Sequence, residues 1–157
     1  MRPFLSVLAF LLIGLLLSSC GGGSYSGYKT AGYRVGGIWY QPLKPQEALG
    51  YTEEGMASHY QEGFFVFAGR DALDGKLYPW SRGAAHKTLP LPCLIRITNL
   101  ENGRETKVRV TDRGPFIRNR MLDVTTPVAK KLGFYDKGLA RVRIEVLSVG
   151  DGRYRVR

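Results

Sequence analysis

The stretch Leu139-Ala140-Arg141-Val142-Arg143-Ile144-Glu145-Val146-Leu147 carries the clearest structural signal in the chain. Apolar and polar residues alternate along it. Because successive side chains of a β-strand point to opposite faces, this alternation predicts a strand with one buried face.

Two further stretches show the same alternation. They are Arg96-Ile97-Thr98-Asn99-Leu100 and Thr106-Lys107-Val108-Arg109-Val110, and the residues Glu101-Asn102-Gly103 between them are typical of a turn. We therefore expect a β-hairpin here. The segment Arg153-Tyr154-Arg155-Val156-Arg157 is compatible with a short terminal strand.

One helix is predicted just before the last long strand. Thr125 or Thr126 can cap its start, Pro127 suits its first turn, and Gly133 ends the run Val128-Ala129-Lys130-Lys131-Leu132. Several short strands with one or two short helices favour a mainly β domain, either a small barrel or a sandwich. We place this domain at residues 55–148, with residues 149–157 as a short terminal strand or tail.

The N-terminus reads as an export signal. Arg2 provides a positive start, the residues from Phe4 to Leu17 are almost all apolar, and Leu17-Ser18-Ser19-Cys20 follows. A cysteine at this place is typical of a bacterial lipoprotein, in which residues 1–19 are removed and the Cys20 thiol is lipidated. The alternative is a transmembrane helix, which needs about 20 apolar residues, but the apolar stretch stops before that.

Residues 20–54 are expected to connect the lipid anchor to the domain. The first part, residues 20–37, is rich in Gly, Ser and Tyr and is predicted to be a flexible tether. Residues 38–53 are predicted to form an extended arm. Gly21 stands where an aspartate would retain many lipoproteins in the inner membrane, so we expect anchoring to the outer membrane of a Gram-negative cell, facing the periplasm.

The chain is basic, with 23 Lys and Arg against 13 Asp and Glu and a formal charge of +10. A basic surface attracts polyanions. For an exported lipoprotein, carboxylate-rich cell wall or an anionic membrane face fits better than nucleic acid, although a basic surface without a partner is also open. Lipidation of Cys20 leaves Cys93 without a disulfide partner, and its apolar neighbours predict a core position. With only His59 and His86 besides, we expect no metal or cofactor.

Three polar clusters are candidates for chemistry. Asp112 stands at the end of a predicted strand, before Gly114-Pro115, where a carboxylate can act as a general acid or can simply cap the turn. Arg113 beside it could bind an anion. His86, in a polar loop, could orient a carboxylate or donate to a sugar, or only bond a backbone carbonyl. Asp123 precedes the predicted helix, where an acidic residue is stabilising in itself.

Aromatic residues cluster between the first and the middle strands. A sugar-stacking platform could be drawn from them, although most aromatic runs belong to a core, so we expect only one or two to be exposed. They are Tyr60, Phe64, Phe65, Phe67, Tyr78 and Trp80.

Taken in order, these motifs resemble the rare lipoprotein A (RlpA) family, which has a six-stranded double-psi β-barrel. The resemblance covers roughly Gly55 to Leu147. The motifs that carry it are Gly55-Met56-Ala57-Ser58-His59-Tyr60, Gly69-Arg70, the stretch from Ala84 to Pro90, Thr111-Asp112-Arg113-Gly114-Pro115-Phe116, Asp123 and the closing strand. The resemblance implies a lytic transglycosylase that cleaves the MurNAc–GlcNAc bond of peptidoglycan to 1,6-anhydromuramic acid products.

The resemblance also assigns site residues. It implies that Asp112 and His86 are the active-site aspartate and histidine. The family's third residue, a glutamate in a Thr-Ala-Asn-Gly-Glu stretch, corresponds to Lys76 here, in Ala72-Leu73-Asp74-Gly75-Lys76. A lysine has no acidic proton to give at neutral pH without a large drop in pKa. Residues expected to contact the glycan are Arg113, Lys76, Tyr60 and Arg70.

Loss of the glutamate leaves two main hypotheses. Hydrolysing glycosidases usually need two carboxylates, but a transglycosylase needs no water, so Asp112 could serve as acid and then as base if it starts protonated. The alternative is a non-catalytic peptidoglycan-binding lipoprotein. A third hypothesis is that the barrel is a scaffold that binds another protein. The presence of both Asp112 and His86 argues against it, because a scaffold does not need them together. The chain ends about 10 residues after Leu147, so we expect no SPOR domain, and divisome or cell-wall proteins are possible partners.

Overall fold

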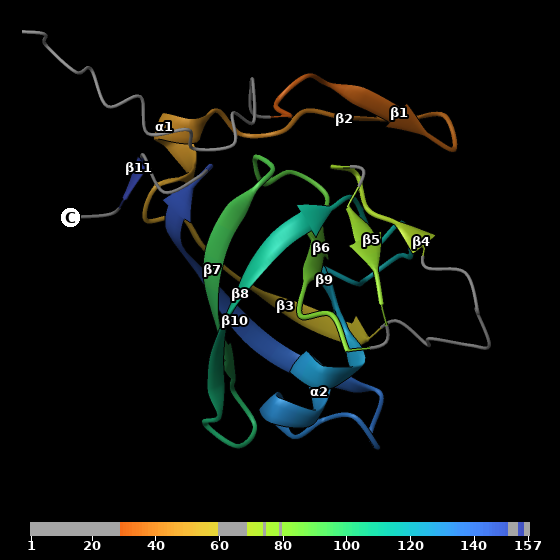
Figure 1. The fold of residues 1–157 in the computed structure, drawn as a ribbon, viewed down its shortest axis with the longest axis vertical. Coiled ribbons are helices and arrows are strands. Elements are labelled where there is room, and N and C mark those ends of the chain that lie inside the picture. Colours follow the sequence, from red (N-terminus) through yellow and green to blue (C-terminus); the bar gives the residue numbers. More distant parts are fainter. Residues whose placement is uncertain (1–28, 60–68, 74, 79, 151–153, 156–157) are drawn as a thin grey trace, which may run out of the picture.

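The computed structural model describes residues 29–59, 69–73, 75–78, 80–150 and 154–155. Six strands form a closed barrel in the order β10-β3-β9-β6-β8-β7, and β7 returns to pair with β10 (Figure 1). The pairs β3–β9 and β6–β8 are parallel and the other pairs are antiparallel. The barrel strands are β3 Thr52–His59, β6 Ala84–His86, β7 Cys93–Asn99, β8 Glu105–Asp112, β9 Leu122–Val124 and β10 Leu139–Val149. The mainly β prediction is confirmed, as a barrel and not as a sandwich.

β10 is the strand predicted from residues 139–147, and it pairs with both β3 and β7. The predicted alternation of buried and exposed side chains is confirmed, because the inward side chains of Ala140, Val142, Ile144 and Val146 are fully buried. Burial of a Val or Ile side chain contributes about 1.5–3 kcal/mol. The predicted hairpin is also confirmed as β7 and β8, which turn at Gly103 with φ +71°.

The helix α2 spans Thr126–Leu132, with Thr125 as N-cap and Gly133, at φ +75°, as C-cap. It buries Val128, Ala129 and Leu132 against the barrel. Its expected start and end are therefore confirmed. The Thr125 hydroxyl oxygen accepts a hydrogen bond from the backbone N–H of Gly83 at 3.2 Å, which ties the helix to the start of β6.

The N-terminal arm is more structured than the sequence predicted. It contains the hairpin of β1 Tyr33–Val35 and β2 Ile38–Tyr40, followed by a helical turn, α1 Pro45–Ala48. Gly36 and Gly37 both have positive φ, as a tight hairpin turn requires. In Figure 1 this hairpin lies across the top of the barrel.

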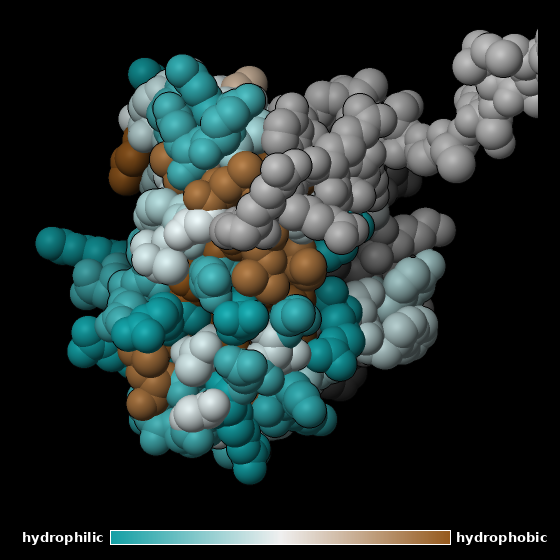
Figure 2. All heavy atoms as spheres, turned by 90° about the vertical axis from the view of Figure 1, so that its left-hand side faces the viewer, coloured by the Kyte–Doolittle hydropathy of each residue, from teal (hydrophilic) through white to brown (hydrophobic). Residues whose placement is uncertain are grey.

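Two short pairings complete the fold. β4 Gly69–Arg70 pairs with β5 Lys76–Leu77, and β11 Tyr154–Arg155 pairs with the end of β10. Cys93 is buried in the core as predicted, and burial raises the pKa of its thiol to about 12. On the face shown in Figure 2, apolar side chains emerge in several separate areas among hydrophilic ones. No helix within the described ranges is long and apolar enough to cross a membrane.

Candidate active site

A β-bulge sets the direction of Asp112. In the β6–β8 pairing Ala84 lies opposite Val110, but Ala85 lies opposite Asp112, so Thr111 is an extra residue on β8. Without the bulge, Asp112 would share the inward face of Val110, which is fully buried. The bulge turns the half-buried Asp112 to the other face, as bulges beside active sites often do.

Two backbone N–H groups hold the Asp112 carboxylate. Its Oδ1 accepts a hydrogen bond from the N–H of Arg113 at 2.8 Å and another from the N–H of Ala72 at 3.0 Å. The first bond is the turn-capping role that the sequence allowed. The second reaches the turn of the β4–β5 hairpin, so Asp112 also joins that hairpin to the barrel.

A second carboxylate lies on the same face. Ala85 pairs with Asp112 on one side and with Asp123 on the other, and Asp123 pairs in turn with Ser58. Two strand spacings separate the Cα atoms of the two aspartates by about 9–10 Å. The Ser58 hydroxyl donates a hydrogen bond to Asp123 Oδ1. We call Ser58, Asp123, Ala85 and Asp112 the carboxylate row.

The structure revises the role expected of Asp123. It was considered as a residue that stabilises the start of the helix, but it lies within β9 and its carboxylate is bound to Ser58 on β3. Thr125 is the N-cap of α2. Asp123 is therefore part of the carboxylate row.

His86 is a buried residue of β6 and not, as predicted, part of a polar loop; only 2 % of it is exposed. Its Nδ1 accepts hydrogen bonds from the backbone N–H groups of Thr88 and Leu89, both at 3.1 Å. The proton of the neutral ring is therefore on Nε2, which donates to Glu53 at 3.2 Å. Both ring nitrogens are thus engaged within the described residues, and the ring orients Glu53, not Asp112.

Glu53 is the residue of this region that sequence reasoning missed. Its carboxylate also accepts a hydrogen bond from the Tyr51 hydroxyl at 2.9 Å. The bond from His86 holds the pKa of Glu53 below its usual value. Burial, helped by the bond to Glu53, raises the pKa of Tyr51 to about 12. No sequence signal distinguished Glu53 from Glu54, which forms exposed ion pairs.

Lys87 connects the Glu53–His86 pair with the carboxylate row. Burial lowers the pKa of its ammonium, while the nearby charges of Glu53 and Asp123 raise it. The ammonium also donates to the backbone oxygen of Arg120. One cation is therefore close enough to both carboxylates to interact with them.

Arg113 binds the protein's own backbone. Its guanidinium donates to the carbonyl oxygens of His86, Lys87 and Leu89 and to that of Lys29, and it lies over the ring of Tyr33 at 5.3 Å from the centroid. Burial lowers its pKa. These contacts hold the loop after His86 and the N-terminal segment beside Asp112. Its predicted contact with the glycan stays a prediction.

The remaining predicted site residues can be placed only in part. Arg70 lies in β4 and Lys76 in β5, with their side chains outside what the structure describes. Tyr60 and the predicted lipidation site, Cys20, are outside the described residues. Among the described aromatic candidates, Tyr78 and Trp80 are both exposed.

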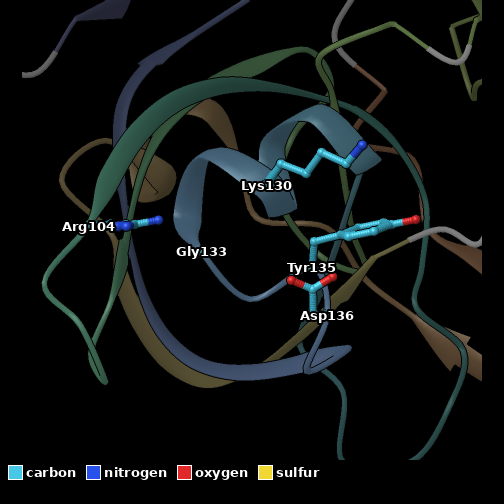
Figure 3. A pocket seen from close by; sticks show the side chains of 5 residues that line it. All are labelled: Arg104, Lys130, Gly133, Tyr135 and Asp136. Atoms are coloured by element: carbon cyan, nitrogen blue, oxygen red, sulfur yellow. The ribbon is translucent and has the colours of Figure 1, made fainter.

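A cavity of about 540 Å³ lies away from the carboxylate row. It is lined by Arg104, Lys130, Gly133, Tyr135 and Asp136, around the end of α2 (Figure 3). Asp112 and Glu105, the neighbour of Arg104, stand at opposite ends of β8, about 23 Å apart. None of the predicted site residues lines this cavity.

A family model described as "Lytic transglycolase", a double-psi β-barrel domain, matches residues 52–144. The chain belongs to this family. The match includes the barrel strands from β3 to most of β10, with Glu53, His86, Asp112 and Asp123. The expected RlpA-like double-psi barrel is thereby confirmed.

The chain is similar in sequence to several curated proteins. The chain is 42 % identical over 126 residues to the endolytic peptidoglycan transglycosylase RlpA of Rickettsia bellii, covering 78 % of this chain and 54 % of the relative. It is 42 % identical over 127 residues to that of Vibrio cholerae, covering 80 % and 46 %. It is 43 % identical over 118 residues to one Pseudomonas aeruginosa protein of that name, covering 74 % of this chain and 33 % of the relative. The chain thus spans about half or less of the length of these relatives.

Solved structures with a similar fold include the Streptomyces papain inhibitor. Its TM-score is 0.49 at 19 % identity, and the match covers 62 % of this chain and 96 % of that one. An expansin of Clavibacter michiganensis gives a TM-score of 0.47 at 17 % identity, with 61 % of this chain and 50 % of that one covered.

Proposed function

We propose that the protein is a lytic transglycosylase that cleaves the glycan strands of peptidoglycan to 1,6-anhydromuramic acid products. The observation that carries the proposal is the position of Asp112, which a bulge turns out of the core and two backbone N–H groups hold in place. Membership of a lytic transglycosylase family supports it. Relatives named endolytic peptidoglycan transglycosylases support the substrate class.

In the proposed mechanism Asp112 acts twice. Because Oδ1 accepts the two N–H bonds, the transferred proton must start on Oδ2 of Asp112. It passes to the glycosidic oxygen while the bond from that oxygen to C1 of the muramic sugar breaks. The 6-hydroxyl oxygen of the same sugar then bonds to C1, and its proton passes to the Asp112 carboxylate. Asp112 returns to its starting state, and no water is consumed.

The other residues of the site would position Asp112 and the substrate. The hydrogen bond from Ala72 and the contacts of Arg113 fix the backbone on both sides of the carboxylate. Asp123 offers a second acceptor on the same face for sugar hydroxyl groups. A carboxylate held by rigid strands loses little freedom when the glycan binds.

The proposal is tested by digesting purified peptidoglycan, intact and amidase-stripped, with the lipid-free protein. We expect 1,6-anhydro ends by mass spectrometry, and none from Asp112→Asn, because an amide cannot give the proton. The matched control is Asp136→Asn, an exposed aspartate at the cavity away from the carboxylate row, and we expect it to retain anhydro products. Absence of products from the unaltered protein, with retained binding to sacculi, would support the peptidoglycan-binding alternative.

We further propose that Cys20 is lipidated and anchors the chain to the outer membrane, facing the periplasm. The support is the sequence of residues 1–21, with its positive start, apolar stretch, Leu17-Ser18-Ser19-Cys20 and following glycine. An anchor there would place the barrel beside peptidoglycan and beside cell-wall and division proteins. The formal charge of +10 favours contact with a carboxylate-rich wall.

A further inference from the structure

Tyr78 and Trp80 form an exposed aromatic pair between β5 and β6. Their rings are parallel within 5°, with centroids 5.0 Å apart. Trp80 is 72 % exposed and Tyr78 is 39 % exposed, and Trp80 is the most exposed large apolar side chain among the described residues. The two rings together expose an apolar surface that folding does not bury, which makes the pair a candidate contact surface for a ligand.

Two hydrogen bonds between Tyr78 and Ser81 close a turn beside the pair. The N–H of Tyr78 donates to the Ser81 hydroxyl at 2.9 Å, and the N–H of Ser81 donates to the Tyr78 carbonyl at 2.8 Å. Arg82 then donates to the Thr106 hydroxyl on β8 at 3.0 Å. Reciprocal bonds and an anchor on the barrel reduce the ordering cost of presenting the rings to a ligand.

The turn is also connected to Asp112. Ala72, whose N–H binds Asp112, and Tyr78 belong to the same segment, which runs through the β4–β5 hairpin. Trp80 is three residues before Gly83 and therefore within about 11 Å of it. A Cβ at Gly83 would lie 3.8 Å from the Thr111 hydroxyl oxygen, next to Asp112. A chain-like ligand that reaches Asp112 can thus reach the pair.

We propose that the Tyr78–Trp80 pair is a binding surface for a pyranose ring of the glycan strand, away from the bond that is cleaved. One face of a pyranose ring carries polarised C–H groups, which pack well on the electron-rich face of an aromatic ring. The two rings stack on each other, so the outer face of Trp80, the more exposed ring, offers a flat surface of this kind. The inference rests on the proposed function for the identity of the glycan, but not for the stacking itself.

The experiment measures glycan binding and turnover separately in the full chain. The binding probes are an N-acetylglucosamine tetramer and amidase-stripped glycan strands, titrated calorimetrically. We expect Trp80→Ala to weaken binding about tenfold and to raise KM with little change in kcat, because a remote subsite binds substrate and transition state alike. Trp80→Phe should recover most of the affinity.

The chain offers a matched control in Trp39 on β2, which is 57 % exposed but packs over Gly32. Trp39→Ala should leave glycan affinity within twofold of the original. Equal losses in both variants, or unchanged affinity in a folded Trp80→Ala, would overturn the proposal. So would a Trp80→Ala protein that loses binding to anionic lipid vesicles and keeps glycan binding, since this would assign the pair to a membrane surface.

The two proposals fail in different ways. If no anhydro products form but Trp80→Ala loses glycan affinity, the binding surface stands and the transglycosylase does not. If anhydro products depend on Asp112 and Trp80→Ala keeps its affinity and KM, the transglycosylase stands and the binding surface is wrong.

Discussion

At the scale of single residues, backbone N–H groups and one buried histidine organise the region around Asp112. Nδ1 of His86 accepts hydrogen bonds from two backbone N–H groups. The only ring proton is therefore on Nε2, which donates to Glu53. Glu53 is ionised at neutral pH because this bond favours the charged form. The pair fixes the end of β6. Just after it, Lys87 donates to the Arg120 carbonyl oxygen, and the Leu89 carbonyl oxygen accepts a hydrogen bond from Arg113.

Substitution of Glu53 tests this arrangement. Glu53→Ala leaves the buried Nε2–H of His86 without its acceptor, and we expect a loss of about 1–3 kcal/mol in the free energy of unfolding. Glu53→Gln keeps an acceptor oxygen and should lose less, about 1 kcal/mol. The measurement is denaturant unfolding at neutral pH, with Glu54→Gln, an exposed neighbour, as the control. A larger loss from Glu54→Gln would contradict the assignment.

The same pair predicts a pH dependence. The pKa of Glu53 in the folded protein lies below its usual value of 4.5. Its contribution is therefore fully present above pH 4.5 and is lost as the pH falls through the lower, folded value. The stability difference between the unaltered protein and Glu53→Gln should shrink below that pH. A stability difference that grows on acidification would contradict a lowered pKa for Glu53 in the folded protein.

The sequence supports prediction of Asp112 but not of the bulge that turns it or of the bond between Glu53 and His86. A carboxylate at a strand end before Gly114-Pro115 is a visible signal, and the family resemblance reinforces it. The bulge at Thr111 is not visible, because it depends on the register between β6 and β8, which are parallel and far apart in sequence. The bond between Glu53 and His86 joins residues 33 positions apart and depends on the same closure of the barrel.

At the scale of elements, short strands and one helix are held by turns with defined geometry. Gly133 ends α2 in the left-handed region, and its N–H bonds the last turn of the helix. Gly103 has a similar φ, +71°, in the β7–β8 turn. Both positions were predictable, because glycine after a helical run or between alternating strands is a recognised signal.

The two glycines make a matched pair. An alanine at Gly103 meets nothing within 4 Å, whereas the Cβ of an alanine at Gly133 would lie 2.6 Å from Arg104 Nη1 and 3.0 Å from Asn102 Nδ2. We expect Gly103→Ala to lose about 1 kcal/mol of stability from the left-handed backbone alone. Gly133→Ala should lose more, measured by thermal unfolding. Equal losses would mean that Arg104 and Asn102 move away without cost.

The arm shows what element-level prediction misses. Residues 33–40 form a hairpin although only three residues on each side pair. So short a hairpin is not stable alone. It is held by contacts to the barrel, such as the bond from the Tyr33 hydroxyl to the Lys87 carbonyl at 2.7 Å. Gly36-Gly37 is typical of a hairpin turn. The Gly-, Ser- and Tyr-rich composition of residues 20–37 nevertheless favoured a flexible tether over a hairpin.

At the scale of the whole molecule, the strand order β9-β6-β8 of the barrel places the two aspartates of the carboxylate row on either side of β6. The alternating strands predicted a closed or layered β fold, and the family resemblance selected the double-psi barrel. For strands farther apart in the sequence than the two strands of a hairpin, only that resemblance indicated which of them pair. Strand patterns fix which face is buried but not which strands are neighbours.

The proposed anchoring is tested on the whole chain in a Gram-negative host. We expect the protein in the outer-membrane fraction, because the first residues match a lipoprotein signal and Gly21 follows Cys20. Cys20→Ala should prevent both lipidation and cleavage. Recovery of the unaltered protein in the inner-membrane fraction would contradict the proposed sorting.

The most direct test of the central claim is a digest of peptidoglycan in water labelled with heavy oxygen. If Asp112 passes a proton to the glycosidic oxygen and takes one from the 6-hydroxyl, the new ends are 1,6-anhydro rings that carry no label, and Asp112→Asn forms none. New reducing ends in place of anhydro ends, with label beyond what existing reducing ends exchange from the water, would show that water attacks C1. That result would contradict the account, because it makes the protein a hydrolase.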